Sequence, residues 1–218
     1  MRITAIEPQK KNPGRRNIYA DGQFVVGVSD ETLLRFGLRI GDEIPPALVQ
    51  ALEQAEELVG AKGVALHFLT VRPRTEREIR DKLREKEFAE EDIVHTIAAL
   101  KSAGLLDDAA FARMYIRDAL SARPAGKMLL KRKLLLLGVE KSVVEDAIEE
   151  CFTGVDVEAA ALTLARQFLK KTQNLRKGES AAKRRNRVSA FLARKGFAWD
   201  VIEAVLKLVS TGGEESEP

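Results

Sequence analysis

The chain has 218 residues, of which 45% are hydrophobic and 32% charged, and its formal net charge is +3. This apolar content is enough for a core in one domain or two small ones, and the high charged fraction fits helices with long solvated faces. One cysteine excludes an intrachain disulfide and a thiolate metal cluster, and an aromatic content of 6% argues against a broad stacking surface for single-stranded nucleic acid. No signal peptide is expected, and the longest purely apolar run, Leu134 to Leu137, is far too short to span a membrane. The sequence therefore predicts a cytoplasmic protein with no membrane contact.

The first sixty residues contain a hairpin signal that the rest of the chain lacks. Asp21-Gly22 lies between two short runs of alternating apolar residues, and both turn residues tolerate a positive φ. The predicted strands are residues 3–8, 17–20 and 23–27.

Two helices are predicted after the hairpin. Ser29 is a good N-cap for a short helix, and Gly37 is placed to end it. A second helix is expected over residues 46–59, with a proline in its first turn. Gly60 and Gly63 then mark the entry to the remainder of the chain.

From residue 61 onward, one helical pattern occurs three times. Four apolar positions in each copy have the spacings 5, 5 and 4, and successive copies are offset by 51 and then by 58 residues. The three sets are Leu83, Phe88, Ile93 and Ile97; Leu134, Val139, Val144 and Ile148; and Leu192, Phe197, Ile202 and Leu206. This spacing predicts the end of one helix, a tight turn, and a second helix with an i, i+4 apolar stripe. Gly138 and Gly196 occupy the turn, where a left-handed residue is expected.

A further amphipathic segment precedes each copy, so the sequence predicts three tandem three-helix repeats. These segments are residues 64–71, 111–120 and 160–169. A unit of about 50 residues has little core of its own, so neighbouring repeats are expected to pack end to end. The predicted fold is mainly α-helical: an elongated, curved array of three repeats behind a small N-terminal β-hairpin and helical region.

The predicted domains follow from these repeats. They are residues 1–60, the three repeats 61–106, 107–154 and 155–210, and a disordered tail at 211–218. The third repeat is seven residues longer than the second, and we expect the extra residues in a mobile loop or extended helix end around 172–182.

Positive charge gathers on the first two helices of successive repeats. Residues 166–195 hold eleven Lys or Arg against one acid (+10), residues 113–133 hold seven against one (+6), and residues 72–86 hold seven against four (+3). In the first repeat, pairs such as Glu78 with Lys82 favour a simple solvated helix face. The stretch Lys183–Arg187 differs, because four cations without acids repel one another. It predicts an anionic partner, nucleic acid or a nucleoprotein, bound through phosphates.

No catalytic, cofactor-binding or metal-binding motif is recognised. The stretch starting at Gly126 lacks the hydroxyl residue of a phosphate loop, and His67 and His95 lack metal-ligand spacing. Asp107 and Asp108 resemble paired catalytic carboxylates, but their position before an amphipathic segment favours helix capping. The sequence therefore predicts a protein that is not an enzyme and needs no cofactor.

Three blocks in the repeats carry a resemblance to a known family. The first is Ala65–Leu69 with Arg72–Leu83, the second is Leu105–Ala112, and the third is Gly126 followed by Leu130, Leu134 and Gly138-Val139. Together they are similar to the RecX family of recombinase regulators over about residues 60–209. Ile79 stands where Leu is commoner, and the third repeat matches the pattern least well.

This resemblance implies a regulator that lodges in the groove of the RecA recombinase filament and contacts both protein and DNA. It implies indirect inhibition of ATP hydrolysis and strand exchange, through limited filament growth or promoted disassembly. We expect a monomer that contacts single- and double-stranded DNA through phosphates. The expected filament- and DNA-binding residues are Arg72, Arg74, Arg113, Arg117, Arg123, Lys127, Lys131, Arg132, Arg176, Lys177, Lys183, Arg184, Arg185 and Arg187.

Two alternatives stay open from the sequence. One is a free-standing DNA-binding protein whose repeats pack like helix-turn-helix units, although a clear recognition helix is missing. The other is a helical repeat scaffold for an acidic protein partner, in which case neither DNA nor RecA is involved. Titration onto preformed recombinase filaments separates all three.

Overall fold

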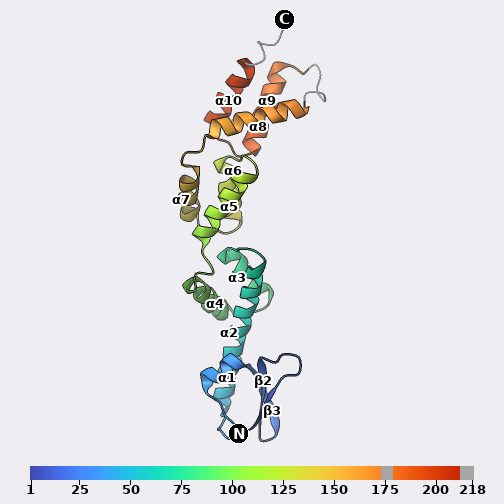
Figure 1. Cartoon of the computed structure of the whole chain (residues 1–218), viewed down its shortest axis with the longest axis vertical. Helices are drawn as coiled ribbons and strands as arrows, with labels where there is room; N and C mark the ends of the chain where they lie inside the picture. Colours follow the sequence, from blue (N-terminus) through green and yellow to red (C-terminus); the bar gives the residue numbers. More distant parts are fainter. Residues whose placement is uncertain (173–178, 212–218) are drawn as a thin grey trace. The chain divides into compact units, whose positions relative to one another are not determined.

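The computed structural model describes residues 1–172 and 179–211, and side chains through residue 209. Within these residues there are three strands and ten helices (Figure 1). The chain divides into two compact units. The first unit comprises Met1–Arg74 and Glu78–Leu106, and the second comprises Thr75–Arg77 and Asp107–Pro218. The predicted mainly helical fold with a small N-terminal sheet is confirmed.

The first unit begins with a three-stranded antiparallel sheet. Its strands are β1 (Ile3–Pro8), β2 (Arg15–Ala20) and β3 (Gln23–Ser29), in the order β1-β2-β3. Asp21 and Gly22 connect β2 and β3 with φ angles of 50° and 81°, as expected for the predicted hairpin turn.

A short helix, α1 (Asp30–Phe36), follows the sheet and has the predicted caps. The Ser29 hydroxyl accepts a hydrogen bond of 3.1 Å from the Thr32 amide, and Gly37 ends the helix with a φ of 64°. Glu56 then ties this cap to the next helix, because its carboxylate accepts from both the amide and the hydroxyl of Ser29, at 2.7 and 2.8 Å.

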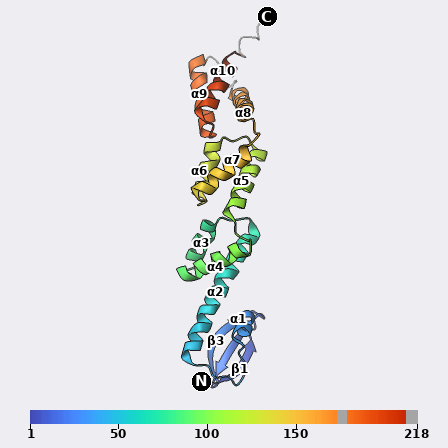
Figure 2. The same cartoon turned by 90° about the vertical axis from the view of Figure 1, so that its left-hand side faces the viewer.

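The next helix, α2 (Pro46–Val71), is continuous for 26 residues (Figures 1 and 2). The prediction that a helix ends at residue 59 is therefore wrong, and Gly60 and Gly63 lie inside α2. A glycine in a helix costs about 1 kcal/mol relative to alanine. Burial offsets this cost, because Leu52 belongs to the core under the sheet while Ala61 and Ala65 belong to the core of the first repeat. The expected domain boundary at residues 60 and 61 thus falls within a helix.

The first repeat combines the second half of α2 with α3 (Glu76–Glu85) and α4 (Glu90–Ser102). Its buried apolar core consists of Ala61, Ala65, Ile79, Leu83, Ile93, Ile97, Leu100 and Leu106. Phe88 is half-buried and packs against this core.

The second repeat consists of α5 (Asp108–Ala122), α6 (Lys127–Leu136) and α7 (Lys141–Phe152). The Asp107 carboxylate accepts from the amides of Ala109 and Ala110 at 2.8 and 2.9 Å, so the predicted cap is confirmed. The core contains Phe111, Ala112, Ile116, Leu130, Leu134, Val139, Val144, Ala147, Ile148 and Phe152.

The third repeat consists of α8 (Val157–Thr172), α9 (Ala181–Arg194) and α10 (Trp199–Thr211). Its core contains Ala161, Ala165, Val188, Leu192, Phe197, Ile202, Val205 and Leu206. The prediction of a mobile loop around 172–182 falls mainly on residues 173–178, outside the described residues, as does the predicted tail from residue 212 onward.

The apolar spacing correctly identified the cores, since eleven of the twelve repeated positions are buried and Phe88 is half-buried. The turn prediction also holds: Gly138 and Gly196 have φ angles of 89° and 82°. Glu87 stands at the same place in the first repeat, 51 residues before Gly138, and it too has a positive φ, of 63°. The backbone of this turn is therefore the same in all three repeats, although only two of them use glycine.

The second and third repeats meet through their backbones. The Gly126 amide donates to the Lys195 carbonyl at 2.9 Å, and the Met128 amide donates to the Gly196 carbonyl at 3.1 Å. A Cβ built on Gly126 would overlap the carbonyl group of Gly196. Side chains are therefore excluded from this contact, and glycine is required at both positions.

A similar contact involves the short segment of the second unit that precedes most of α3. The Thr75 hydroxyl donates to the Leu137 carbonyl at 2.7 Å, and the Arg77 side chain lies against Gly138. Thr75 and Leu137 lie 51 and 58 residues before Gly126 and Lys195, so the same two repeat positions are hydrogen-bonded in both cases.

Candidate nucleic-acid interface

The start of α9 carries a cluster of three exposed cations, Lys183, Arg184 and Arg185, which we call the α9 cluster. Ser180 caps the helix, and its first turn contains no acidic residue. Within the described residues, none of the three cations has a carboxylate oxygen within 4.0 Å. A helix N-terminus carries partial positive charge, so these cations face an unfavourable field unless an anion binds.

Arg187 was predicted to act with this cluster, but its side chain has a different environment. Only 18% of the side chain is exposed, and the guanidinium pairs with Glu179, whose side chain is 10% exposed, through bonds of 2.7 and 3.2 Å. It also donates to the Thr172 hydroxyl at 2.7 Å and lies over the Phe168 ring. Arg187 therefore joins α8 and α9 inside the third repeat and presents little free charge.

The candidate cations of α5 share one acid. The Arg117 guanidinium lies 3.1 Å from the Glu150 carboxylate and the Arg113 guanidinium lies 3.9 Å from it. All three side chains are at least one-third exposed, so solvent screens the pairs. These two arginines are partly neutralised but stay accessible to a stronger anion.

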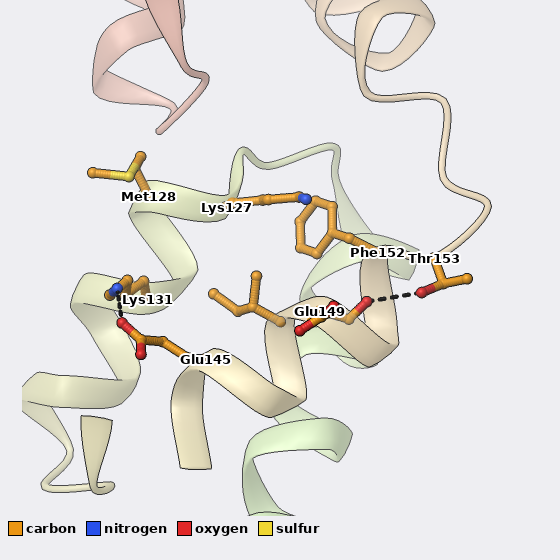
Figure 3. A pocket seen from close by; sticks show the side chains of 8 residues that line it. Lys127, Met128, Lys131, Glu145, Glu149, Phe152 and Thr153 are labelled. Carbon is orange, nitrogen blue, oxygen red and sulfur yellow. Dashed lines mark hydrogen bonds and ion pairs between the residues drawn. The ribbon is translucent and has the colours of Figure 1, made fainter. Parts of the chain in front are cut away.

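Helix α6 presents Lys127, Lys131 and Arg132, and they differ in environment. Lys131 pairs with Glu145 of α7 across an open pocket of about 560 Å³ (Figure 3), and its hydrogen bond lowers the pKa of the Glu145 carboxyl. The Lys127 ammonium lies 5.3 Å from the centre of the Phe152 ring in the same pocket. Arg132 is exposed, with no carboxylate partner among the described residues. Lys131 is thus largely compensated, whereas Arg132 is free to bind an anion.

Arg123 follows α5 directly and is exposed. It borders a second hollow, which α8 and α9 also line. No carboxylate lies within 4.0 Å of its guanidinium in the described part of the chain.

In the first unit, the candidates Arg72 and Arg74 both pair with Glu78. The Arg74 side chain is 13% exposed, and its guanidinium stacks 3.8 Å from the centre of the Phe68 ring. Arg74 therefore has a packing role, as Arg187 has in the third repeat. The remaining candidates, Arg176 and Lys177, lie outside the described residues.

The structure also reveals cations that sequence reasoning counted but did not select. Lys133 is exposed on α6, and Lys171 and Lys195 border the same hollow as Arg123. Their signal in the sequence was the scarcity of neighbouring acids. Their grouping depends on how the repeats pack, which charge counting does not show.

Two searches of the described residues bear on other chemistry. They find no group of three or more His, Cys, Asp or Glu side chains able to hold a metal ion. They also find no helix long and apolar enough to cross a membrane.

The small sheet, the three helical repeats and their exposed basic residues define a helical-repeat protein with anion-binding surfaces. Four family models match the chain: the regulatory protein RecX N-terminal domain over residues 1–45, and the first, second and third RecX three-helix domains over residues 61–100, 107–148 and 156–206. The chain belongs to the RecX family of regulatory proteins.

Individual relatives agree with this assignment along almost the whole chain. It is 32% identical over 210 residues to the regulatory protein RecX of Clostridium botulinum (strain Alaska E43), covering 94% of this chain and 95% of that protein. It is 31% identical over 206 residues to that of Clostridium acetobutylicum, covering 94% of each chain.

Two crystal structures of RecX proteins also resemble it. One, titled as a regulatory protein RecX, has a TM-score of 0.80 at 29% identity over 94% of this chain and 98% of that one. The other, RecX from Lactobacillus salivarius, has a TM-score of 0.64 at 25% identity over 72% of this chain and 99% of that one.

Proposed function

We propose that this protein binds the RecA nucleoprotein filament along its groove and inhibits recombination by limiting filament growth or promoting disassembly. It acts as a monomer in the cytoplasm and catalyses no reaction of its own. Family membership and the sequence resemblance described above support RecA as the partner, and the exposed cations support contact with DNA phosphates.

The α9 cluster carries this proposal. Lys183, Arg184 and Arg185 lie close together at the positive end of a helix, without an acid in its first turn. Such an arrangement does not stabilise the free protein, because like charges repel and the helix dipole adds to the repulsion. A phosphate backbone relieves both effects. Exposed Arg123 and Arg132 supply further cations on the second repeat.

Phosphate binding predicts a definite dependence on salt. Each phosphate contact releases a counterion, so the logarithm of the affinity falls linearly with the logarithm of the salt concentration. Loss of three contacts should reduce this slope by about 2 to 3 units. A variant with Lys183→Gln, Arg184→Gln and Arg185→Gln tests this number directly.

The first experiment titrates the protein onto preformed RecA filaments on single-stranded DNA and follows ATP turnover. We expect inhibition at amounts well below one protein per recombinase protomer, because each bound molecule acts on filament growth rather than on one active site. The α9-cluster variant should need a higher concentration for half-inhibition. The matched control loses three exposed cations of the first unit, through Lys10→Gln, Lys11→Gln and Arg39→Gln, and should inhibit like the unmodified protein.

Other outcomes favour the alternatives. Tight binding to naked DNA with no effect on the filament would support a free-standing DNA-binding protein. No effect on ATP turnover even in molar excess, together with no DNA binding, would favour a scaffold for an acidic protein and overturn the proposal.

A further inference from the structure

The second unit contains a hollow of about 750 Å³ bordered by the end of α5 and by α8 and α9. Its cationic residues are Arg123, Lys171 and Lys195, and its apolar residues include Leu164, Phe168 and Phe191. No Asp or Glu is among the lining residues. We call this the α8–α9 hollow; it is distinct from the α9 cluster, which lies at the other end of α9.

The charge of the hollow calls for an anionic ligand. The three cations come from three different elements, and within the described residues none has a carboxylate within 4.0 Å. Helix ends favour cations, which accounts for Lys171 and Lys195 singly, since they lie at the C-terminal ends of α8 and α9. That effect does not account for Arg123, whose guanidinium joins them from the second repeat.

The aromatic rings in the hollow do not suit a nucleobase. Phe168 and Phe191 stack on each other, with centroids 4.2 Å apart and an angle of 7° between the rings. Arg187 lies over Phe168 at 5.2 Å and Lys195 lies over Phe191 at 5.7 Å. Little aromatic surface is left for the base stacking on which single-strand binders rely. A bare phosphate backbone, in turn, gains nothing from the apolar walls.

We infer that the α8–α9 hollow binds an acidic, amphipathic polypeptide segment, in which carboxylates pair with Arg123, Lys171 and Lys195 and aliphatic side chains cover Leu164 and the ring edges. Charge complementarity and apolar burial then act together, as they do at the centres of protein interfaces. The inference rests on the proposed function only in taking this segment to belong to the protein part of the filament. It divides the labour: the α9 cluster contacts DNA and the hollow contacts protein.

The test uses two fluorescein-labelled probes with the full chain, a ten-residue peptide of alternating glutamate and leucine and a single-stranded thymidine oligonucleotide. Two variants each lose two cations: Arg123→Gln with Lys171→Gln in the hollow, and Lys183→Gln with Arg184→Gln in the α9 cluster. The hollow variant should bind the peptide at least tenfold more weakly and the oligonucleotide within twofold of the unmodified chain. The cluster variant should show the opposite pattern. Circular dichroism and thermal unfolding of each variant confirm that it is folded.

A second peptide, of alternating glutamate and serine, has the same charge without the aliphatic side chains. It should bind the unmodified chain at least fivefold more weakly than the glutamate–leucine peptide. Equal binding of the two peptides, or unchanged peptide binding by the hollow variant, would overturn the inference. So would a loss of oligonucleotide binding in the hollow variant, which would make the hollow a nucleic-acid site. Failure of the α9-cluster variant to change DNA affinity would instead count against the proposed function and leave the peptide result standing.

Discussion

The backbone of Gly126, at the start of α6, rests directly on the backbone of Gly196, at the turn before α10, and the Gly126 amide is bonded to the Lys195 carbonyl at 2.9 Å. This contact joins the second repeat to the third. Because no side chain takes part, the two repeats have no means of adjusting to an added atom.

The first prediction concerns Gly126→Ala. The φ of Gly126 is −79°, which alanine adopts without strain, so the whole effect should come from overlap with Gly196. Overpacking of this kind costs about 1 to 3 kcal/mol. Urea unfolding followed by circular dichroism measures the loss. Gly14→Ala is the control, since its added Cβ meets nothing within 4 Å, and an equal loss in both variants would contradict the close contact.

The second prediction separates backbone strain from packing at Gly196. Gly196→Ala combines a positive φ of 82° with overlap on Leu129, whereas Gly154→Ala has a φ of 76° and open space around the new Cβ. Both should lose about 1 kcal/mol through strain. Only Gly196→Ala should lose a further 1 to 3 kcal/mol or so, measured as the difference between the two unfolding free energies. Similar values for the two variants would mean that the neighbouring backbone moves aside freely.

The third prediction concerns the ion pair between Glu179 and Arg187. Glu179→Gln leaves the largely buried guanidinium without its carboxylate, which should destabilise the third repeat by about 2 kcal/mol or more. Trp199, the one tryptophan of the sequence, lies at the start of α10, so its fluorescence during urea unfolding reports on this repeat. Glu149→Gln removes an exposed carboxylate from the same unit and should leave the transition unchanged. If both substitutions had equal effects, Arg187 would not depend on its pair.

The fourth prediction sets stability against binding at one position. Lys183→Glu should stabilise α9, because Ser180 and a glutamate three residues later form a capping box and the acid suits the positive helix end. We expect a gain of about 0.5 to 1.5 kcal/mol together with weaker DNA binding. Thermal unfolding and DNA titration of the same sample measure both. Weaker binding with lower stability would instead assign Lys183 to the fold.

The fifth prediction concerns acid stability in the first unit. Burial raises the pKa of Glu56, but hydrogen bonds from Thr32 and Ser29 and the charge of Arg15 outweigh it, so the pKa lies below its ordinary value. The resulting stability is present above the unfolded-state pKa, about 4.3, and is lost as the pH falls through the lower folded-state value.

Glu56→Gln should therefore be less stable at neutral pH and should lose less additional stability between about pH 5 and pH 3. Unfolding free energies of the two proteins across this range measure the difference. Glu57→Gln, which removes the neighbouring exposed carboxylate, is the control and should follow the pH profile of the unmodified chain. Parallel profiles for Glu56→Gln and the unmodified chain would show that Glu56 does not titrate in this way.

The repeated apolar spacing predicted the three cores because burial in a helical pair depends on local periodicity. Leu83, Leu134 and Leu192 are fully buried, as the offsets of 51 and 58 require. Helix α2 was missed because local propensity disfavours Gly60 and Gly63, whereas packing on two cores keeps the helix intact. Propensity is local, and these cores are not.

The candidate site was predictable in location but not in detail. Counting charges correctly pointed to the α9 cluster, yet it treated Arg187 like its neighbours and Arg74 like Arg72. Both Arg74 and Arg187 stack on a phenylalanine of another helix and pair with a carboxylate. Compensation of this kind is a property of the tertiary structure. The α8–α9 hollow was missed for the same reason, because its cations come from elements more than forty residues apart.

The glycine contact has a consequence for the evolution of the chain. A contact between two side chains can be repaired after one mutation by a compensating mutation in the partner. Gly126 meets the carbonyl group of Gly196, which every amino acid carries, so no change at position 196 can make room for a larger residue at 126. We therefore expect both positions to be invariant rather than to covary among relatives, and a search for contacts through correlated substitutions would overlook this one.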